Sequence, residues 1–173
     1  MNGDLKVFDS KHAQLLTTNI HSETAITDCL FFKSDLLNTN VVVTASEVPN
    51  PALTFSYLSN DRKSLNVVSK AKYSALDPSE GITCLAQNPM TLEIIASASS
   101  HGGDILVWNV DPSKWQSDER VLENKRQKTG IATIDPTATL NCTHGTQSIK
   151  WITPETLVAG GLDHQLKVFD IQK

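Results

Sequence analysis

Cysteine is scarce in this chain of 173 residues, and its three copies stand far apart at Cys29, Cys84 and Cys142. None belongs to a Cys-x-x-Cys pair or stands in a cluster with histidines, which are the usual sequence patterns of zinc sites. The sequence therefore predicts neither a metal site nor a disulfide framework, and we expect no cofactor. A chain without a disulfide framework also fits a reducing, intracellular compartment.

Long hydrophobic runs are missing as well. The strongest, at 29–32 and 41–43, fall far short of the roughly 20 residues that a membrane helix needs, so we expect no membrane contact. Lys and Arg number 15 against 19 Asp and Glu, a net charge of −4. This balance excludes a basic surface over the whole chain but leaves room for a local basic patch.

Signatures of catalysis are absent from the sequence too. There is no Gly-x-Ser-x-Gly elbow and no other nucleophile motif. The His-Gly-Gly-Asp segment at 101–104 lacks the following helix and the Lys-Ser/Thr pair of a phosphate-binding loop, so we predict a strand-to-strand turn there. We predict no catalytic residues and expect that the protein is not an enzyme.

What the sequence does contain is a recurring short motif. Leu-Lys-Val-Phe-Asp stands at 5–9 and again at 166–170, Ile-Leu-Val-Trp-Asn stands at 105–109, and a weaker copy covers 53–58. Period-two alternation that ends in an aromatic and a turn former is typical of a short strand before a turn. With a polar insertion at 111–135 set aside, the period is about 40 residues, close to that of a WD repeat.

Further β-rich runs lie between these closing strands. They cover 41–46, 94–99 and 157–161, each preceded by another short run at 26–32, 82–86 or 148–152, and each unit opens with a run at 14–20, 65–70 or 137–141. No helical spacing is sustained. Short strands separated by polar turns predict an all-β fold, a WD-repeat β-propeller of about three blades plus the edge of a fourth. The predicted units are a closing strand at 3–10, blades at about 11–59, 60–110 and 136–172, and an inserted polar loop at 111–135.

The segment 160–170 resembles the closing part of a WD repeat. Asp163 stands six residues before the aromatic Phe169, and Asp170 follows, as in that family. The resemblance implies that Asp163 lies in a tight turn and bonds a histidine of the preceding loop, for which His144 is the match. We expect His144 and Asp163 to form a structural pair that locks a blade, not a catalytic pair.

The other units depart from this pattern. Asn2, Pro51 and Gly102 stand where the motif has its aspartate. The locking network is therefore expected in one blade at most.

The order of features is similar to that of a narrower family, the WD-repeat ribosome-biogenesis factors of the PeBoW complex. Those proteins place a basic Lys/Arg-Gln-Lys-Thr loop between two central blades, followed by a Pro-Thr-hydrophobic strand. Here Asn-Lys-Arg-Gln-Lys-Thr-Gly at 124–130 precedes Pro-Thr-Ala-Thr-Leu at 136–140.

This resemblance implies a non-catalytic scaffold of the nucleolus and nucleoplasm that acts in large ribosomal subunit assembly and pre-ribosomal RNA processing. The implied partners are a block-of-proliferation-type WD-repeat protein, a pescadillo-family protein bound through it, and the pre-large-subunit particle. A midasin-type ATPase is expected to bind only through a ubiquitin-like domain, which these 173 residues do not contain. The alternative is a generic WD-repeat adaptor of another complex, a ubiquitin ligase receptor or a splicing scaffold, because fold does not decide function.

The family propeller has seven blades, more than these 173 residues can form. An incomplete ring exposes the apolar faces of its end blades. We therefore expect either that the sequence is an excerpt of a longer protein, which we favour, or that other chains close the ring.

The insertion carries two further candidate sites. Lys125, Arg126 and Lys128 form a basic group that either contacts pre-ribosomal RNA or serves nuclear import, or else belongs to a solvated loop. Trp115 is either an anchor for a partner or packs back on its own blade. Trp151, within a strand pattern, is expected in the core.

Overall fold

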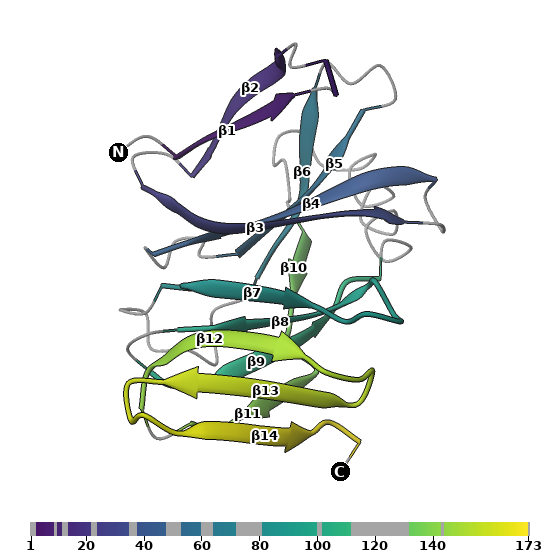
Figure 1. The fold of residues 1–173 in the computed structure, drawn as a ribbon. Coiled ribbons are helices and arrows are strands. Elements are labelled where there is room, and N and C mark those ends of the chain that lie inside the picture. Colours follow the sequence, from purple (N-terminus) through teal and green to yellow (C-terminus); the bar gives the residue numbers. More distant parts are fainter. Residues whose placement is uncertain are drawn as a thin grey trace.

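The computed structural model describes residues 3–8, 10–11, 14–21, 24–34, 38–47, 53–59, 64–71, 81–99, 102–111, 132–142 and 144–172. Over these ranges the chain forms strands and turns without any helix, arranged as four β-sheets stacked one on the next (Figure 1). The predicted all-β fold class is therefore confirmed.

Each sheet is built mainly from strands that follow one another in the chain. The first sheet holds β1 (Gly3–Phe8) and β2 (Gln14–His21); the second β3 (Ile26–Ser34), β4 (Thr39–Ser46), β5 (Leu53–Leu58), β6 (Leu65–Ala71) and β10 (Ala132–Ile134); the third β7 (Cys84–Gln87), β8 (Ile94–Ala98), β9 (Ile105–Asn109) and β11 (Ala138–Leu140); and the fourth β12 (Thr146–Trp151), β13 (Thr156–Gly161) and β14 (Leu166–Asp170). The four predicted closing strands are confirmed as β1, β5, β9 and β14.

In the first three sheets, the strand that pairs with the far side of the closing strand comes from the next sequence unit. We assigned the runs at 14–20, 65–70 and 137–141 to the units that they open, but β2 pairs with β1, β6 with β5, and β11 with β9. The sheets are thus offset by one strand from the predicted units. Hydrophobic alternation marks a strand but does not name its partner, and here the preceding closing strand is the partner.

One strand was missed altogether. The segment 111–135, predicted as a polar loop, ends in β10, which pairs in parallel with β6 so that Ala132 lies opposite Ser69 and Ile134 opposite Ala71. Every other strand pair in the described sheets is antiparallel. A parallel neighbour this distant in sequence leaves no hairpin signal to read.

The second and third sheets enclose one hydrophobic cluster. Alternate side chains of β4 and β5, among them Val43 and Phe55, meet Ile95, Leu106 and Trp108 of the third sheet, and all five are buried. Because side chains alternate between the two faces of a strand, the intervening residues point the other way.

The opposite face of the third sheet packs on the fourth sheet. Its Ile105 and Val107 join Ile149, Trp151 and Leu157 in a second cluster. The Trp151 indole, 6% exposed, donates a hydrogen bond from Nε1 to the Ala86 carbonyl at 3.3 Å. Its predicted place in the core is confirmed.

Polar contacts also tie neighbouring sheets together. The Leu85 amide of β7 donates to Asp28 Oδ2 of β3 at 2.8 Å, and Asn88 Nδ2 donates to the Pro154 carbonyl at 2.7 Å. Asn88 is buried, and its Oδ1 accepts the amides of Met90 and Thr91, so its amide group is paired on both sides. Such contacts fix the sheets laterally as well as through their cores.

Candidate functional site

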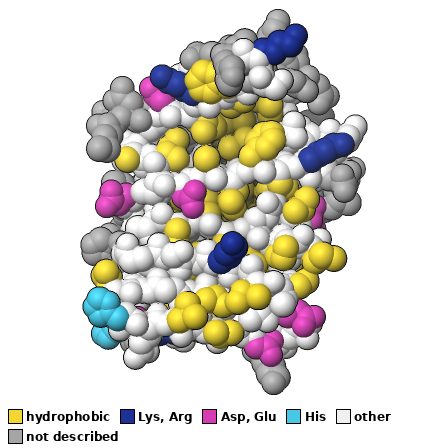
Figure 2. Space-filling view, in the orientation of Figure 1, with side chains coloured by type: hydrophobic (Ala, Val, Ile, Leu, Met, Phe, Trp, Pro, Cys, Tyr) yellow, Lys and Arg dark blue, Asp and Glu magenta, His cyan; other side chains and the backbone are white. Residues whose placement is uncertain are grey.

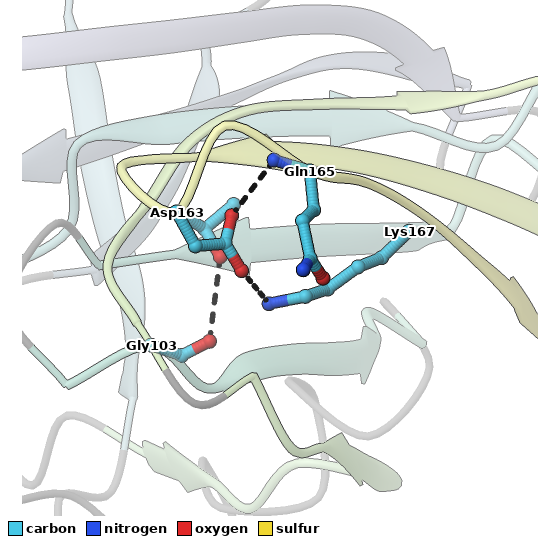
Figure 3. Close-up of polar contacts among 5 residues, drawn as sticks. Gly103, Asp163, Gln165 and Lys167 are labelled. Atoms are coloured by element: carbon cyan, nitrogen blue, oxygen red, sulfur yellow. Dashed lines mark hydrogen bonds and ion pairs between the residues drawn. The ribbon is translucent and has the colours of Figure 1, made fainter.

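The turn between β13 and β14 carries Asp163, the residue that the repeat motif singles out. Its Oδ1 accepts the Gln165 amide at 3.1 Å, and its Oδ2 pairs with Lys167 Nζ at 2.6 Å (Figure 3). A carboxylate that accepts the amide two residues later stabilises a tight turn locally. His164 completes this turn with a φ of 59°, the left-handed conformation that histidine tolerates better than most residues.

The loop that contains His144 lies between this turn and the corresponding turn of the third sheet. On one side the Leu162 amide donates to the Gly145 carbonyl at 3.0 Å. On the other side Thr146 Oγ1 donates to the Gly103 carbonyl at 3.3 Å (Figure 3). Gly103 has a φ of 82°, and a Cβ there would collide with the Cys142 carbonyl, so the close approach requires glycine. A strand-to-strand turn was predicted at 101–104; its described part, residues 102–104, lies between β8 and β9, and residue 101 is outside the described residues.

Asp163 has two hydrogen-bond partners in the described part of the chain, the Gln165 amide and the Lys167 ammonium. His144 is exposed, and its charge is the last of the causes that lower the pKa of Asp163. The structure brings His144 and Asp163 into one group of turns, but their role as a blade-locking pair stays a prediction. Lys167 is the partner that the sequence reasoning missed, because the motif draws attention to the histidine.

The electrostatics of this pair are those of a structural ion pair. The hydrogen bond from Lys167, followed by that from the Gln165 amide, holds the pKa of Asp163 below its ordinary value. The hydrogen bond to Asp163 raises the pKa of Lys167. Both shifts favour the charged forms at neutral pH, whereas a general acid or base needs a pKa close to the working pH.

A second polar pair is buried between the second and third sheets. Trp108 Nε1 donates to Ser97 Oγ at 2.9 Å, and the two side chains are 0% and 1% exposed. The sequence pattern marks Trp108 as the closing aromatic of its unit but does not single out Ser97. The signal for it was the small-residue run at 94–99, where a serine faces the aromatic strand across the sheet.

The remaining predicted site residues, Trp115, Lys125, Arg126 and Lys128, lie outside the described residues, and their roles stay predictions. The ends of this segment are described. Val110 donates its amide to the Glu93 carbonyl at 2.7 Å, and the chain returns as β10 on the edge of the second sheet. Gly103 stands just before β9 and Val110 just after it, so Val110 lies at the end of the third sheet away from the Asp163 turn.

The described residues show neither a group of metal ligands nor a cysteine with the lowered pKa of a reactive thiol. Within those ranges no group of at least three His, Cys, Asp or Glu side chains gathers as metal ligands would. All three cysteines are free, and burial raises the pKa of Cys84 and, together with the charge of Asp28, that of Cys29. A raised pKa keeps these thiols protonated at neutral pH, and the thiolate is the reactive form. No helix long and apolar enough to cross a bilayer occurs in the described ranges.

Comparison with known proteins supports the fold. No protein-family model matches the sequence, and a comparison with curated proteins found no match. Among solved structures, the chain is similar to the crystal structure of the Myceliophteria thermophila Cps50 (Swd1) β-propeller domain, with a TM-score of 0.62 and 12% sequence identity. The match covers 98% of this chain but 48% of that one, so the chain spans about half the length of the solved domain. The chain therefore has the fold of a partial β-propeller.

Proposed function

We propose that this chain belongs to a non-catalytic protein-interaction scaffold that acts in large ribosomal subunit assembly and pre-ribosomal RNA processing, in the nucleolus and nucleoplasm. The observation that carries the proposal is the order of features in the sequence, a basic segment at 124–130 between two units of a WD-repeat propeller. The propeller fold supports the scaffold part. The assembly pathway rests on the sequence resemblance alone.

The described structure is suited to holding a partner without chemistry. Its sheets are fixed by two hydrophobic clusters and by polar ties such as Asp28 to Leu85. A rigid stack of this kind presents the strand-connecting loops at its two ends as stable binding surfaces. The Asp163–Lys167 ion pair belongs to this framework because it orders a turn.

The proposed partners are a block-of-proliferation-type WD-repeat protein, a pescadillo-family protein through it, and the pre-large-subunit particle. A contact between two propellers can bury a standard protein interface, whereas the three charges of Lys125, Arg126 and Lys128 add a salt-sensitive attraction to RNA. We assign the basic group to RNA or import, and Trp115 to a peripheral anchor.

The test is a pull-down of the full-length protein that contains this chain, at low and high salt. Replacing Lys125, Arg126 and Lys128 with Ala should leave the block-of-proliferation-type partner bound at both salts and weaken pre-ribosome association at low salt. The matched control replaces Lys6, Lys33 and Lys150, three exposed lysines of the described strands, with Ala.

Two outcomes contradict the proposal. If the partner is lost at both salts only in the insertion variant, the insertion is itself the protein-binding site. If the unaltered protein instead recovers ubiquitin ligase or splicing subunits, the chain is an adaptor of another complex and the ribosomal assignment is wrong.

A further inference from the structure

The loop that joins β7 to β8 is held in place by side-chain hydrogen bonds. Asn88, which is 1% exposed, accepts the amides of Met90 and Thr91 on its Oδ1, each at 3.0 Å. Gln87 Nε2 donates to the Leu92 carbonyl at 3.0 Å. A loop fixed in this way loses little conformational entropy when a partner binds to it.

This loop presents apolar side chains to solvent. Met90 is 75% and Leu92 36% exposed. The fourth sheet closes its corresponding hairpin, between β12 and β13, with residues 152–155 alone, whereas the loop of the third sheet runs from 88 to 93. The hairpin therefore does not need the extra length to close, and the unbranched thioether of methionine adapts well to a binding partner.

The exposure of Met90 does not come from a missing neighbour of its sheet. The third sheet packs on the second sheet through one hydrophobic cluster and on the fourth sheet through the other. Both of its faces are thus covered by described strands of this chain, and the loop extends beyond them at the end of the sheet.

The third sheet carries only negative charge among the residues that the structure describes. Glu93 belongs to the same loop as Met90, and Asp111 follows Val110, whose amide donates to the Glu93 carbonyl at 2.7 Å. These carboxylates therefore lie at the same end of the sheet as the apolar tip of the loop. Lys and Arg are absent from the described ranges that form the sheet, 81–99, 102–111 and 138–140.

Lysines of the two neighbouring sheets point away from the third. Phe32 of β3 and Trp151 of β12 belong to the clusters that face it. Since side chains alternate along a strand, Lys33 and Lys150, which stand next to them, point to the opposite faces of their sheets. The fourth sheet adds the exposed carboxylate of Glu155 in its β12–β13 loop. Figure 2 shows hydrophobic side chains at the right-hand margin near the β7–β8 loop, with acidic side chains above and below them.

We propose that the loop between β7 and β8 binds a basic peptide segment of a partner protein, in which apolar side chains alternate with lysine or arginine. The apolar side chains contact Met90 and Leu92, and the cations face the carboxylates of Glu93 and Asp111. Charge complementarity of this kind selects the partner and is salt-sensitive, while the apolar contact excludes water at the centre. The proposal does not rest on the ribosomal assignment.

The first experiment measures binding of the synthetic peptide Lys-Leu-Lys-Phe-Lys-Leu-Lys to the full chain by isothermal titration calorimetry. We expect binding that weakens as salt is raised, and no binding of the peptide that has glutamate in place of every lysine. Met90→Ser should raise the Kd at least about fivefold, because it removes the apolar tip of the loop. Leu162→Ser is the matched control, since Leu162 is 60% exposed in the turn between β13 and β14, at the opposite end of the stack.

The contribution of charge is tested separately. Glu93→Gln should weaken peptide binding at low salt, and the difference from the unaltered chain should vanish at high salt. Asp104→Asn, which removes a carboxylate just before β9 at the other end of the same sheet, should leave binding unchanged. Equal effects of Glu93→Gln and Asp104→Asn would show that only the net charge of the chain attracts the peptide, and the proposed site would be wrong.

Amide NMR signals of the unaltered chain keep the result interpretable if a variant folds poorly. On titration with the peptide, the signals of residues 90–93 should shift and those of residues 161–164 should not. The proposal is overturned if the peptide does not bind, if it shifts both groups alike, or if it binds Met90→Ser as tightly as the unaltered chain.

The insertion at 111–135 is the other source of basic residues to test. If replacing Lys125, Arg126 and Lys128 with Ala tightens peptide binding, the insertion of this chain competes for the loop, and the assignment to a partner protein is wrong. Unchanged binding in this variant supports the partner.

Discussion

At the scale of single residues, Asp163 orders its turn through two contacts, with the Gln165 amide and the Lys167 ammonium. The resemblance to a WD repeat implied that Asp163 lies in a tight turn, and the structure confirms this turn. The turn could be predicted because such turns are encoded by residues close together in the sequence. The choice of Lys167 as its charged partner follows from the direction of a side chain on β14, which the motif does not report.

The Asp163–Lys167 pair predicts a specific dependence of stability on pH. The pKa of Asp163 is lowered in the folded chain, so its contribution is present above the ordinary value of 3.8 and is lost as pH falls through the lower folded value. The pKa of Lys167 is raised, so its contribution is present below its ordinary value of 10.5 and is lost as pH rises through the higher folded value.

We therefore expect Asp163→Asn to be less stable than the unaltered chain at neutral pH and to lose this difference in acid. Thermal unfolding followed by circular dichroism from neutral to strongly acidic pH measures it. Glu155→Gln, which removes an exposed carboxylate from the turn before β13, is the control. A constant gap between the Asp163→Asn and unaltered curves at all pH values would contradict the assignment.

We expect substitutions of Trp108 and Ser97 to have non-additive effects on the free energy of unfolding, because one hydrogen bond joins the two side chains. Trp108→Phe keeps an aromatic ring in the core but leaves the Ser97 hydroxyl buried without its donor, which should lower the free energy of unfolding by about 1–3 kcal/mol. Ser97→Ala leaves the indole N–H unpaired in the same way. The double variant should cost less than the sum of the single variants in urea unfolding, and simple additivity would show that the hydrogen bond has no energetic role.

At the scale of elements, the closing strands were found from the sequence because each carries its alternation and its aromatic within a few residues. β10 was not, because its neighbour β6 is distant in the chain. The pairing matters for function, since β10 ends the segment in which the basic group and Trp115 stand.

The pairing of β10 with β6 can be tested by one substitution in β10. Thr133→Pro removes a backbone N–H and restricts the backbone of β10, so β10 should leave β6. The amides of residues 69–71 that point to β10 should then exchange faster with solvent, while Thr133→Val, a good strand former, should keep them protected. Equal protection in both variants would mean that β10 contributes nothing to the edge of the second sheet.

At the scale of the whole molecule, the packing between neighbouring sheets differs along the stack. The third sheet has apolar clusters on both of its faces, whereas the second sheet turns buried hydroxyls toward the first. We therefore expect the first sheet to be the part of the stack that separates most easily.

The uneven packing can be measured with one isosteric change. Thr54→Val removes a buried hydroxyl that has no partner, so it should raise the free energy of unfolding by about 1 kcal/mol. Thr44, which lies opposite Thr54 in β4 and is 1% exposed, does have a partner, so Thr44→Val should destabilise the chain. Midpoints of urea unfolding compare the two, and a Thr54→Val variant no more stable than the unaltered chain would count against the description of this interface.

The sequence by itself determined where the strands other than β10 lie and that they build a propeller, because alternation, closing aromatics and turn residues act over a few residues at a time. Only the tertiary structure decided which sheet each outermost strand joins, that β10 pairs in parallel with β6, and that Asp163 bonds Lys167. These outcomes depend on backbone groups and side chains that meet only once the sheets have formed and stacked, and no local pattern records such contacts.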